Sequence, residues 1–344
     1  MLAEAQFIRG YAYFWLVRCY GEVPVVTGNA TLDEALNMVR EPVTTVYELV
    51  EDDFEFAINN LPEVSPKGRA NKYVTEAELA RVYLMQSGYP INENKLDEAI
   101  PLLEDIINSG RYQLEESYAD IFTLEGENGP EIIWSGIMDA NPNGNRHREA
   151  YLLDQNAGPR AICDPEFAPG EDPLLGNLWL SFEPGDIRRR VSLDTAGVNN
   201  VGTHQKQMNN AKYRYGFVPG FGWTSDYIFT RYANVLLLYA EILHKTNHNS
   251  IIEGKWEIIN KIRKRAGLEE VSPELDFMEV LLNERRHEFI WEAVRWFDMV
   301  RTNTFVEELQ KVQHDNAVDF WKYLPIPIDE LEKMGGLWEN NEGY

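Results

Sequence analysis

Hydrophobic positions in the first 112 residues recur at helical spacing and predict four helices, which start near residues 3, 45, 75 and 96. The first helix is apolar on most sides, and the fourth carries one apolar stripe that ends at Gly110. The last two helices together are about as long as one tetratricopeptide unit, and the first two have similar proportions. We therefore expect two degenerate helical hairpins in this part of the chain.

Two of these helix starts are indicated by a hydroxyl residue followed three positions later by a glutamate, which is the spacing of a capping box. Thr45 with Glu48 opens the second predicted helix, and Thr75 with Glu78 opens the third. The first helix is expected to end at Gly21, a residue type that favours the end of a helix.

The helical periodicity is lost between about residues 125 and 224. Glycine, proline, asparagine and aromatic residues dominate this segment, and only residues 132–136 resemble a short strand. A long irregular stretch inside a compact domain is unusual and tends to carry function. Helices resume near residue 228 and continue to about 304, and a proline-containing tail expected to be extended follows them.

These patterns predict a mostly α protein made of one domain, residues 1–344. Tetratricopeptide-like hairpins (residues 1–112) are expected to pack on C-terminal helices that continue into the tail (residues 228–344). The loop-rich segment between them, residues 113–227, is expected to be the ligand-binding region, because irregular segments on a rigid scaffold often carry binding residues.

Residues 283–301 combine charges of both signs with tryptophans in a pattern that a solvated helix does not need. Asp276, with Glu279 three residues later, predicts the start of one long helix. Apolar residues fill one wide arc of this helix, and Arg286 and Arg301 project inside that arc. We expect the helix to be buried, with both arginines bound to carboxylates or carbonyls. The predicted structural network consists of Glu284, Arg285, Arg286, Glu288, Arg295, Asp298 and Arg301.

The same stretch resembles the C-terminal signature of the RagB/SusD family, through Glu284-Arg285-Arg286-x-Glu288 followed by Glu292-Ala293-x-Arg295-Trp296-x-Asp298-x-x-Arg301. Further blocks agree with this family in order and spacing. They are Ala5 to Phe14 with Tyr20 to Pro24, Gly68 to Leu84 with Ser109 to Leu114, Arg231 to Glu241, Asn260 to Leu268, and Leu324 to Pro327. Ala293 is a departure, because the family usually carries glycine there, and we expect a mild effect on a helix.

The resemblance implies what the protein does. Members of this family are glycan-binding lipoproteins on the outer membrane of Bacteroidetes. By this resemblance the chain would capture oligosaccharide at the cell surface, without catalysis, and deliver it to a SusC-like TonB-dependent transporter. The family varies in its sugar-binding region, so none of its sugar contacts transfers by motif to a numbered residue here.

The start of the chain differs from the family pattern. Family members carry a secretory signal, a lipid-bearing cysteine and further residues before the block that opens this sequence, whereas here Met1 leads directly into a helix. We expect the helix at residues 3–20 to lose a neighbour. It would then expose an apolar patch with residues such as Phe7, Tyr11 or Trp15.

Composition excludes several classes of protein. Lys and Arg number 32 against 56 Asp and Glu, which gives a net charge of −24. Such a charge repels a phosphate backbone, so we expect no nucleic-acid partner. No apolar run reaches the roughly 18 to 20 residues of a membrane span. Cys19 and Cys163 are too few for a disulfide scaffold.

The irregular segment supplies groups that hold sugars. A sugar ring presents apolar C–H faces and polar edges, so flat aromatic side chains and side-chain amides match it. The predicted ligand-binding residues are Trp179, Tyr215, Phe221 and Trp223. The alternative is that such aromatics fill a loop-rich core. The hairpins would then serve as a protein-interaction scaffold without a sugar site.

Signals for catalysis or metal binding are weak. Glu284 and Glu288 are one helical turn apart and resemble the carboxylate pair of a glycoside hydrolase. The arginines around them would neutralise both carboxylates and lower their pKa values, which spoils a general acid. His244 and His248 have helical spacing but no evident third ligand. We therefore expect no catalytic residue, no metal and no cofactor.

Overall fold

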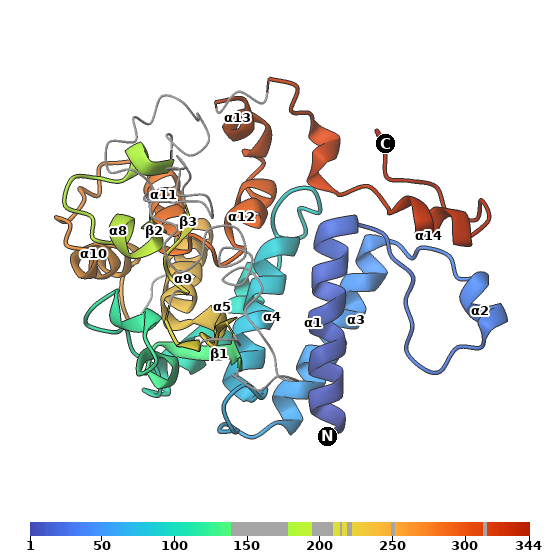
Figure 1. Ribbon diagram of the computed structural model, residues 1–344, viewed down its shortest axis with the longest axis horizontal. Coiled ribbons are helices and arrows are strands. Elements are labelled where there is room, and N and C mark those ends of the chain that lie inside the picture. Colours follow the sequence, from blue (N-terminus) through green and yellow to red (C-terminus); the bar gives the residue numbers. More distant parts are fainter. Residues whose placement is uncertain (139–177, 195–208, 214, 219–221, 249–251, 312–314) are drawn as a thin grey trace. The chain divides into compact units, whose positions relative to one another are not determined.

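The structure is a computed structural model that describes the chain except for residues 139–177, 195–208, 214, 219–221, 249–251 and 312–314 (Figure 1). Helices dominate it, and the predicted mostly α class with tetratricopeptide-like hairpins is confirmed. Contacts divide the chain into two compact units. Unit 1 holds residues 1–65, 70–95 and 299–344, and unit 2 holds residues 66–69 and 96–298. The division into three consecutive segments stays a prediction.

Unit 1 is built on three long helices. They are α1 (Leu2–Tyr20), α3 (Val43–Asn60) and α4 (Lys72–Gln86). α1 packs on α3, and α3 packs on α4. Gly10 allows the first contact to be close, because a Cβ at this position would lie 3.0 Å from the ring of Phe54. At the same contact, Arg9 binds the fully buried carboxylate of Asp53 at 2.6 Å.

Two predicted caps in unit 1 are wrong. α3 starts before Thr45, with Pro42 at its N-cap position. α4 starts before Thr75, where the side chain of Asn71 accepts a hydrogen bond from the backbone N–H of Val74 at 2.9 Å. An asparagine side chain caps a helix as well as a hydroxyl does. Because Asn71 stands one turn earlier, the helix begins there.

The tail of unit 1 contains short helices rather than one extended segment. After α13 (Phe305–Gln310) come η4 (Asp319–Lys322) and α14 (Ile328–Lys333). α14 starts directly after Pro327, whose fixed φ suits the start of a helix. The tail is tied to the start of the chain, because the backbone N–H of Leu324 donates to the carbonyl of Cys19 at 2.7 Å.

The prediction of which α1 side chains are exposed is wrong for Phe7. That ring is 1% exposed and packs on the ring of Phe54, with centroids 5.5 Å apart. Tyr11 and Trp15 are half-buried. The large apolar side chains that α1 exposes lie on its other side, and they are Leu2, Ile8 and Leu16.

Unit 2 is organised around α9 (Tyr232–Thr246), whose residues 232–243 are all buried. It packs against α5 (Leu96–Asn108), α10 (Lys255–Arg265) and α11 (Phe277–Glu288). The other elements between α5 and α9 are short. They are η1 (Asp120–Phe122), η2 (Gly126–Asn128), β1 (Ile132–Gly136), α8 (Arg188–Ser192), β2 (Leu193–Asp194), β3 (Asn209–Asn210), β4 (Phe217–Val218), β5 (Gly222–Trp223) and β6 (Tyr227–Arg231).

The predicted strand at residues 132–136 is confirmed as β1. It pairs antiparallel with β6, with Ser135 opposite Ile228 and Gly136 opposite Tyr227. β6 runs into α9 without a connecting loop, because Arg231 ends the strand and Tyr232 begins the helix. The side chain of Arg231 is therefore fixed at the junction of a strand and a buried helix.

The long helix expected over residues 283–301 is divided. The cap prediction is confirmed, because Asp276 accepts a hydrogen bond from the N–H of Glu279 at 2.8 Å at the start of α11. α11 ends at Glu288, and α12 (Arg295–Arg301) follows after a turn. Trp291 and Ala293 in this turn have φ values of 67° and 55°. Ala293 is thus not on a helix but in a left-handed position, where a residue with a Cβ costs roughly 1 to 2 kcal/mol.

Among the helices that the structure describes, none is long and apolar enough to cross a membrane.

The close approach at Gly88 gives a test of the fold of unit 1. A Cβ on Gly88 would lie 2.5 Å from the carbonyl oxygen of Arg301, which also accepts a hydrogen bond from the backbone N–H of Tyr89 at 2.9 Å. We expect Gly88→Ala to lower the free energy of unfolding by roughly 1 to 3 kcal/mol, measured by urea denaturation. Gly28→Ala is the matched control, because a Cβ there meets nothing within 4 Å. Equal stability of the two variants would contradict the close approach.

Candidate functional site

The interior of unit 2 contains a cluster of charged side chains, which we call the acid–base network. Its members are Glu131, Glu183, Asp186, Arg188, Lys212, Arg231, Arg263, Arg265, Glu284, Glu288 and Glu292. The carboxylate of Glu288 lies at its centre, is fully buried and binds three arginines. These are Arg231 at 2.6 Å, Arg188 at 3.3 Å, and Arg265.

Arg231, at the junction of β6 and α9, is one of the central cations of the network. Its guanidinium is fully buried and binds Glu131 at 2.7 Å and Glu292 at 2.9 Å, in addition to Glu288. It also donates to the carbonyl of Glu288 at 2.7 Å. A buried guanidinium is stable only when its donors are satisfied in this way.

The network ties two parts of the loop-rich segment to α11 and the turn that follows it. Arg188, in α8, binds Asp186 at 2.7 Å and Glu284 at 2.8 Å. Lys212, after β3, binds Glu292 at 2.6 Å and donates to the carbonyl of Glu288 at 2.9 Å. These contacts hold α8 and the residues after β3, two described parts of the loop-rich segment, against α11 and the turn after it.

Burial by itself would raise the pKa of the Glu288 carboxyl group. Arg265, Arg231 and Arg188 outweigh burial and hold the pKa below its ordinary value. The nearby Glu284 is 1% exposed and is also bound by Arg188 and by Arg263, the latter at 2.7 Å. Because a general acid must hold a proton near neutral pH and reach its substrate, Glu288 is unsuited to that role.

The residues of the predicted structural network do not form a single cluster in the structure. Glu284 and Glu288 belong to the acid–base network. Arg285 instead binds Asp298 at 2.8 Å and Asn234 at 3.1 Å. The expectation that Arg286 is buried is wrong, because its side chain is half-buried, as is that of Arg295. Arg301 is 4% exposed and belongs to unit 1.

Sequence reasoning missed the cations that bind Glu284 and Glu288. Arg231, Arg263 and Arg265 stand in blocks that resemble the family, but Arg188 and Lys212 stand in no recognised motif. Their carboxylate partners are far away in the sequence, as the 100-residue separation of Arg188 and Glu288 shows. A helical pattern identifies only partners within a few residues.

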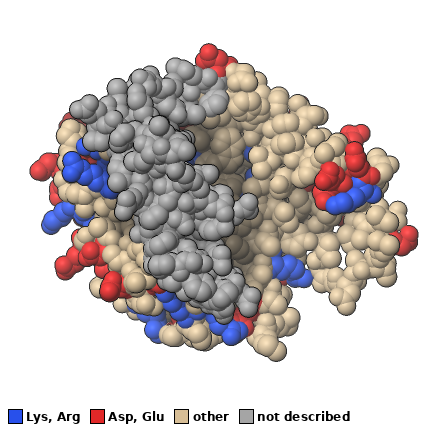
Figure 2. Space-filling view, in the orientation of Figure 1, with Lys and Arg blue, Asp and Glu red and all other residues tan. Residues whose placement is uncertain are grey.

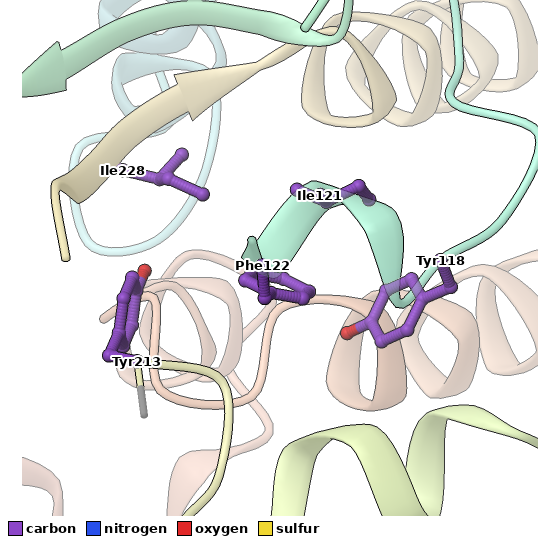
Figure 3. Packing of buried hydrophobic residues seen from close by; sticks show 5 residues of the cluster. All are labelled: Tyr118, Ile121, Phe122, Tyr213 and Ile228. Carbon is purple, nitrogen blue, oxygen red and sulfur yellow. The ribbon is translucent and has the colours of Figure 1, made fainter. Parts of the chain in front are cut away.

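A buried hydrophobic cluster, which we call the aromatic cluster, lies next to cations of the network. Figure 3 shows its five side chains. The cluster consists of Tyr118, Ile121, Phe122, Tyr213 and Ile228, all of them buried. The ammonium of Lys212 lies 4.8 Å from the centroid of Phe122, and the guanidinium of Arg231 lies 5.9 Å from that of Tyr118. The aromatic faces thus provide further favourable contacts for the buried cations.

Trp179, one of the predicted ligand-binding residues, is half-buried. It packs on a second hydrophobic cluster of Phe182, Leu193 and Ile290. The guanidinium of Arg189 lies over its ring, with Cζ 4.8 Å from the ring centroid. One part of the indole is therefore fixed by the protein while another part faces outward.

Two of the other three predicted ligand-binding residues lie in or near the paired strands β4 and β5, in which Phe217 is opposite Trp223. Tyr215 is half-buried and packs against the first aromatic cluster. For Trp223 the structure describes the backbone only, and Phe221 lies outside the described residues.

Trp291 connects the surroundings of Trp179 with those of Tyr215. It is half-buried and packs against both hydrophobic clusters. Its Nε1 donates to the carbonyl of Ser192 at 2.9 Å, and its φ of 67° is the left-handed conformation of the turn after α11. The break in the predicted helix therefore places a tryptophan between the two candidate regions.

His287 supports the segment that carries Trp179. Its Nε2 lies 2.8 Å from Oγ of Ser181, and its ring stacks on Phe182 with centroids 4.2 Å apart. Burial, together with nearby arginines such as Arg188, lowers the pKa of His287 to about 3. The imidazole is therefore neutral at physiological pH.

Other site types find little support in the described part of the chain. No group of three or more His, Cys, Asp or Glu residues there could hold a metal ion. On the face drawn in Figure 2, described Lys and Arg side chains lie in small groups near Asp and Glu and do not merge into a basic patch.

We expect Glu288→Gln to lower the free energy of unfolding by roughly 3 to 5 kcal/mol, because it leaves buried arginines without their carboxylate. Urea denaturation at pH 7 measures this loss. Glu330→Gln is the control, because Glu330 pairs with Lys333 at an exposed position, where the expected loss is roughly 0 to 1 kcal/mol. Losses of equal size would contradict the central position of Glu288.

We expect His287→Gln to reduce the pH dependence of stability. The pKa of His287 in the folded protein is about 3, below its ordinary value of 6.5. The stability that the neutral His287 ring contributes is therefore fully present above pH 6.5, and it falls as the pH drops towards 3. The wild type should lose roughly 2 to 3 kcal/mol from this group between pH 7 and 4.5. Urea unfolding at both pH values measures the difference. His248→Gln is the control, because His248 is exposed. If His287→Gln lost as much unfolding free energy between pH 7 and pH 4.5 as the wild type does, a buried neutral His287 ring would be contradicted.

Known proteins share both sequence and fold with this chain. The model of the SusD family matches residues 192–344. A model described as starch-binding, associating with outer membrane, matches residues 1–84. The SusD-like protein P25 of Formosa agariphila is 25% identical over 401 residues, which cover 100% of this chain and 73% of that protein.

Solved structures have the same fold. A SusD superfamily protein from Parabacteroides distasonis has a TM-score of 0.77 at 24% identity, covering 99% of this chain and 78% of that one. Surface glycan-binding protein A from Bacteroides thetaiotaomicron, in complex with laminarihexaose, has a TM-score of 0.75 at 21% identity, covering 98% and 77%. Family models match both ends of the sequence, and the fold matches that of solved SusD superfamily structures, so the chain is similar to the RagB/SusD family in sequence and in fold.

Proposed function

We propose that this protein is a non-catalytic glycan-binding protein of the bacterial outer surface, which captures oligosaccharide and delivers it to a SusC-like TonB-dependent transporter. The model matched by residues 1–84 is described as starch-binding and associating with outer membrane. A protein of similar fold is known in complex with laminarihexaose. Both support a glycan as ligand. Co-isolation of the transporter from outer membranes tests the partner.

The observation that carries the proposal is the half-buried Trp179 in the loop-rich segment. Its indole packs on Phe182, Leu193 and Ile290, so the ring is already ordered before a ligand arrives. An ordered aromatic platform loses little conformational entropy on binding. It offers a large flat surface to the apolar face of a sugar ring. Tyr215, Phe221 and Trp223 are proposed to extend this platform.

A glycoside hydrolase is less well supported. The carboxylates of Glu284 and Glu288 are buried and bound by arginines, so they are not placed to act on a substrate. A binding protein needs no acid–base pair, because it must hold the sugar without cleaving it. The charged residues of α11 are better explained as support for the ligand-binding segment.

A protein-interaction scaffold is the alternative from a different class. It would gain support if the tryptophans of the loop-rich segment were fully buried, because a sugar could not reach them. Trp179 is half-buried, which favours the sugar site.

We expect Trp179→Ala to weaken oligosaccharide binding at least tenfold, which corresponds to about 1.4 kcal/mol. A glycan array identifies a ligand first, and titration calorimetry then compares the variant with the wild type. Trp256→Ala is the matched control, because Trp256 is also half-buried in unit 2 but packs against Phe277 of α11. The control should bind as the wild type does.

Three outcomes would contradict the proposal. If no oligosaccharide binds, the protein is not a glycan receptor, and the scaffold function becomes preferred. If a glycan binds equally well to the wild type and to Trp179→Ala, the site lies elsewhere. If new reducing ends form when the protein is incubated with a polysaccharide, the protein is an enzyme.

A further inference from the structure

Arg189 differs from the other arginines around the candidate site. Its guanidinium lies over the indole of Trp179, with Cζ 4.8 Å from the ring centroid. Its Nε is enclosed by the protein and has no hydrogen-bond acceptor. Among the described residues, none forms an ion pair with Arg189. A half-buried guanidinium thus stands beside the proposed sugar platform without a carboxylate.

Within the described part of unit 2, neighbouring arginines bind carboxylates, whereas Arg189 does not. Arg188, the preceding residue, binds Asp186 at 2.7 Å and Glu284 at 2.8 Å. Arg231 and Arg263 each bind a carboxylate at 2.6 Å. The chain carries 56 acidic residues against 32 basic ones. In such an acidic protein, the absence of a carboxylate partner for Arg189 among the described residues is not explained by a shortage of acidic side chains.

The position of Arg189 suits the binding of an anion. A guanidinium on an aromatic face is stabilised by the cation–π contact, and this contact uses none of its N–H donors. The donors form a planar fork that fits a carboxylate or a sulfate ester through two parallel hydrogen bonds. The Nε of Arg189 is removed from water without an acceptor, and a hydrogen bond to a partly buried charged group contributes more than one at an exposed side chain.

The overall charge of −24 does not prevent such binding. Charges on the surface are screened over roughly 8 Å at physiological ionic strength, so the groups next to the ligand dominate. At this point the chain carries three consecutive arginines. Arg188 is neutralised by its carboxylates, whereas Arg189 lies over Trp179 and Arg190 is exposed. The local field beside the indole is therefore positive.

We propose that the ligand is an acidic oligosaccharide, in which one sugar ring stacks on Trp179 while its carboxylate or sulfate group binds the guanidinium of Arg189. This inference rests on the proposed function and names the class of glycan. In this arrangement Trp179 recognises the apolar face of the ring, and Arg189 selects for the negative charge beside it. A neutral sugar would stack on the same platform but would leave the guanidinium without an acceptor.

The test uses pairs of oligosaccharides that differ only in charge. Oligogalacturonate is compared with its methyl ester, and a sulfated oligosaccharide is compared with its desulfated form. Neutral glucan oligosaccharides are included as a third set. We expect the acidic member of at least one pair to bind at least tenfold more tightly than its neutral counterpart in titration calorimetry. A difference in affinity within the galacturonate pair would identify a carboxylate ligand, and a difference within the sulfated pair would identify a sulfate ligand.

Variants of the full chain then assign this preference to Arg189. We expect Arg189→Gln to remove the preference for the acidic member and to leave binding of its neutral counterpart within twofold of the wild type. Trp179→Ala should weaken both members. The control is Lys311→Gln, which removes one positive charge from an exposed residue of unit 1. It should keep the preference. Circular dichroism melting checks that each variant is folded.

The outcomes separate this inference from the proposed function. Binding of neutral glycans alone, or equal binding within every pair, would overturn the acidic ligand and leave glycan capture standing. A preference that persists in Arg189→Gln would overturn the role of Arg189. If no oligosaccharide of any set binds, glycan capture itself fails, and the inference fails with it.

Discussion

The structure of unit 2 depends on the ion pair between Arg231 and Glu288, whose side chains are both fully buried and lie 2.6 Å apart. Removing either charge from water costs several kcal/mol, and one contact would not offset this. Each ion is therefore shared, with Arg231 also bound to Glu131 and Glu292. The charges compensate one another only as a group, so the segments that carry them must be in place together.

This requirement links the core to the candidate site. Arg188 and Lys212 belong to the loop-rich segment, and both are held by carboxylates of α11 or of the turn after it. Next to Arg188 stands Arg189, which lies over Trp179. The ligand-binding residues therefore stand in short elements, such as α8 for Arg189 and β5 for Trp223, and not in long helices or a large sheet. The charge pairs next to them supply the support that such short elements lack, which is how a loop-rich segment can present an ordered surface.

Some local features were predictable from the sequence, whereas the distant ion pairs were not. The cap at Asp276 and the strand at residues 132–136 depend on neighbours a few positions away, and both were predicted. The break after Glu288 was not, because Trp291 and Ala293 adopt left-handed conformations that helical periodicity does not reveal. The network arginines show the same limit, since an arginine alone does not indicate which distant carboxylate it meets. For the sugar platform, sequence reasoning could select aromatic residues of one segment but not their exposure.

The spacing of the network along the chain has a consequence for how the protein forms during synthesis. Many of its ion pairs join distant residues. Arg231 is 57 positions from Glu288 and 100 positions from Glu131. Contacts of such separation form slowly, because a long loop must close first. Glu292, the last member, leaves the ribosome after most of unit 2 has been made. Until then Lys212 and Arg231 lack the carboxylate of Glu292, so the network can be completed only late in the synthesis of unit 2.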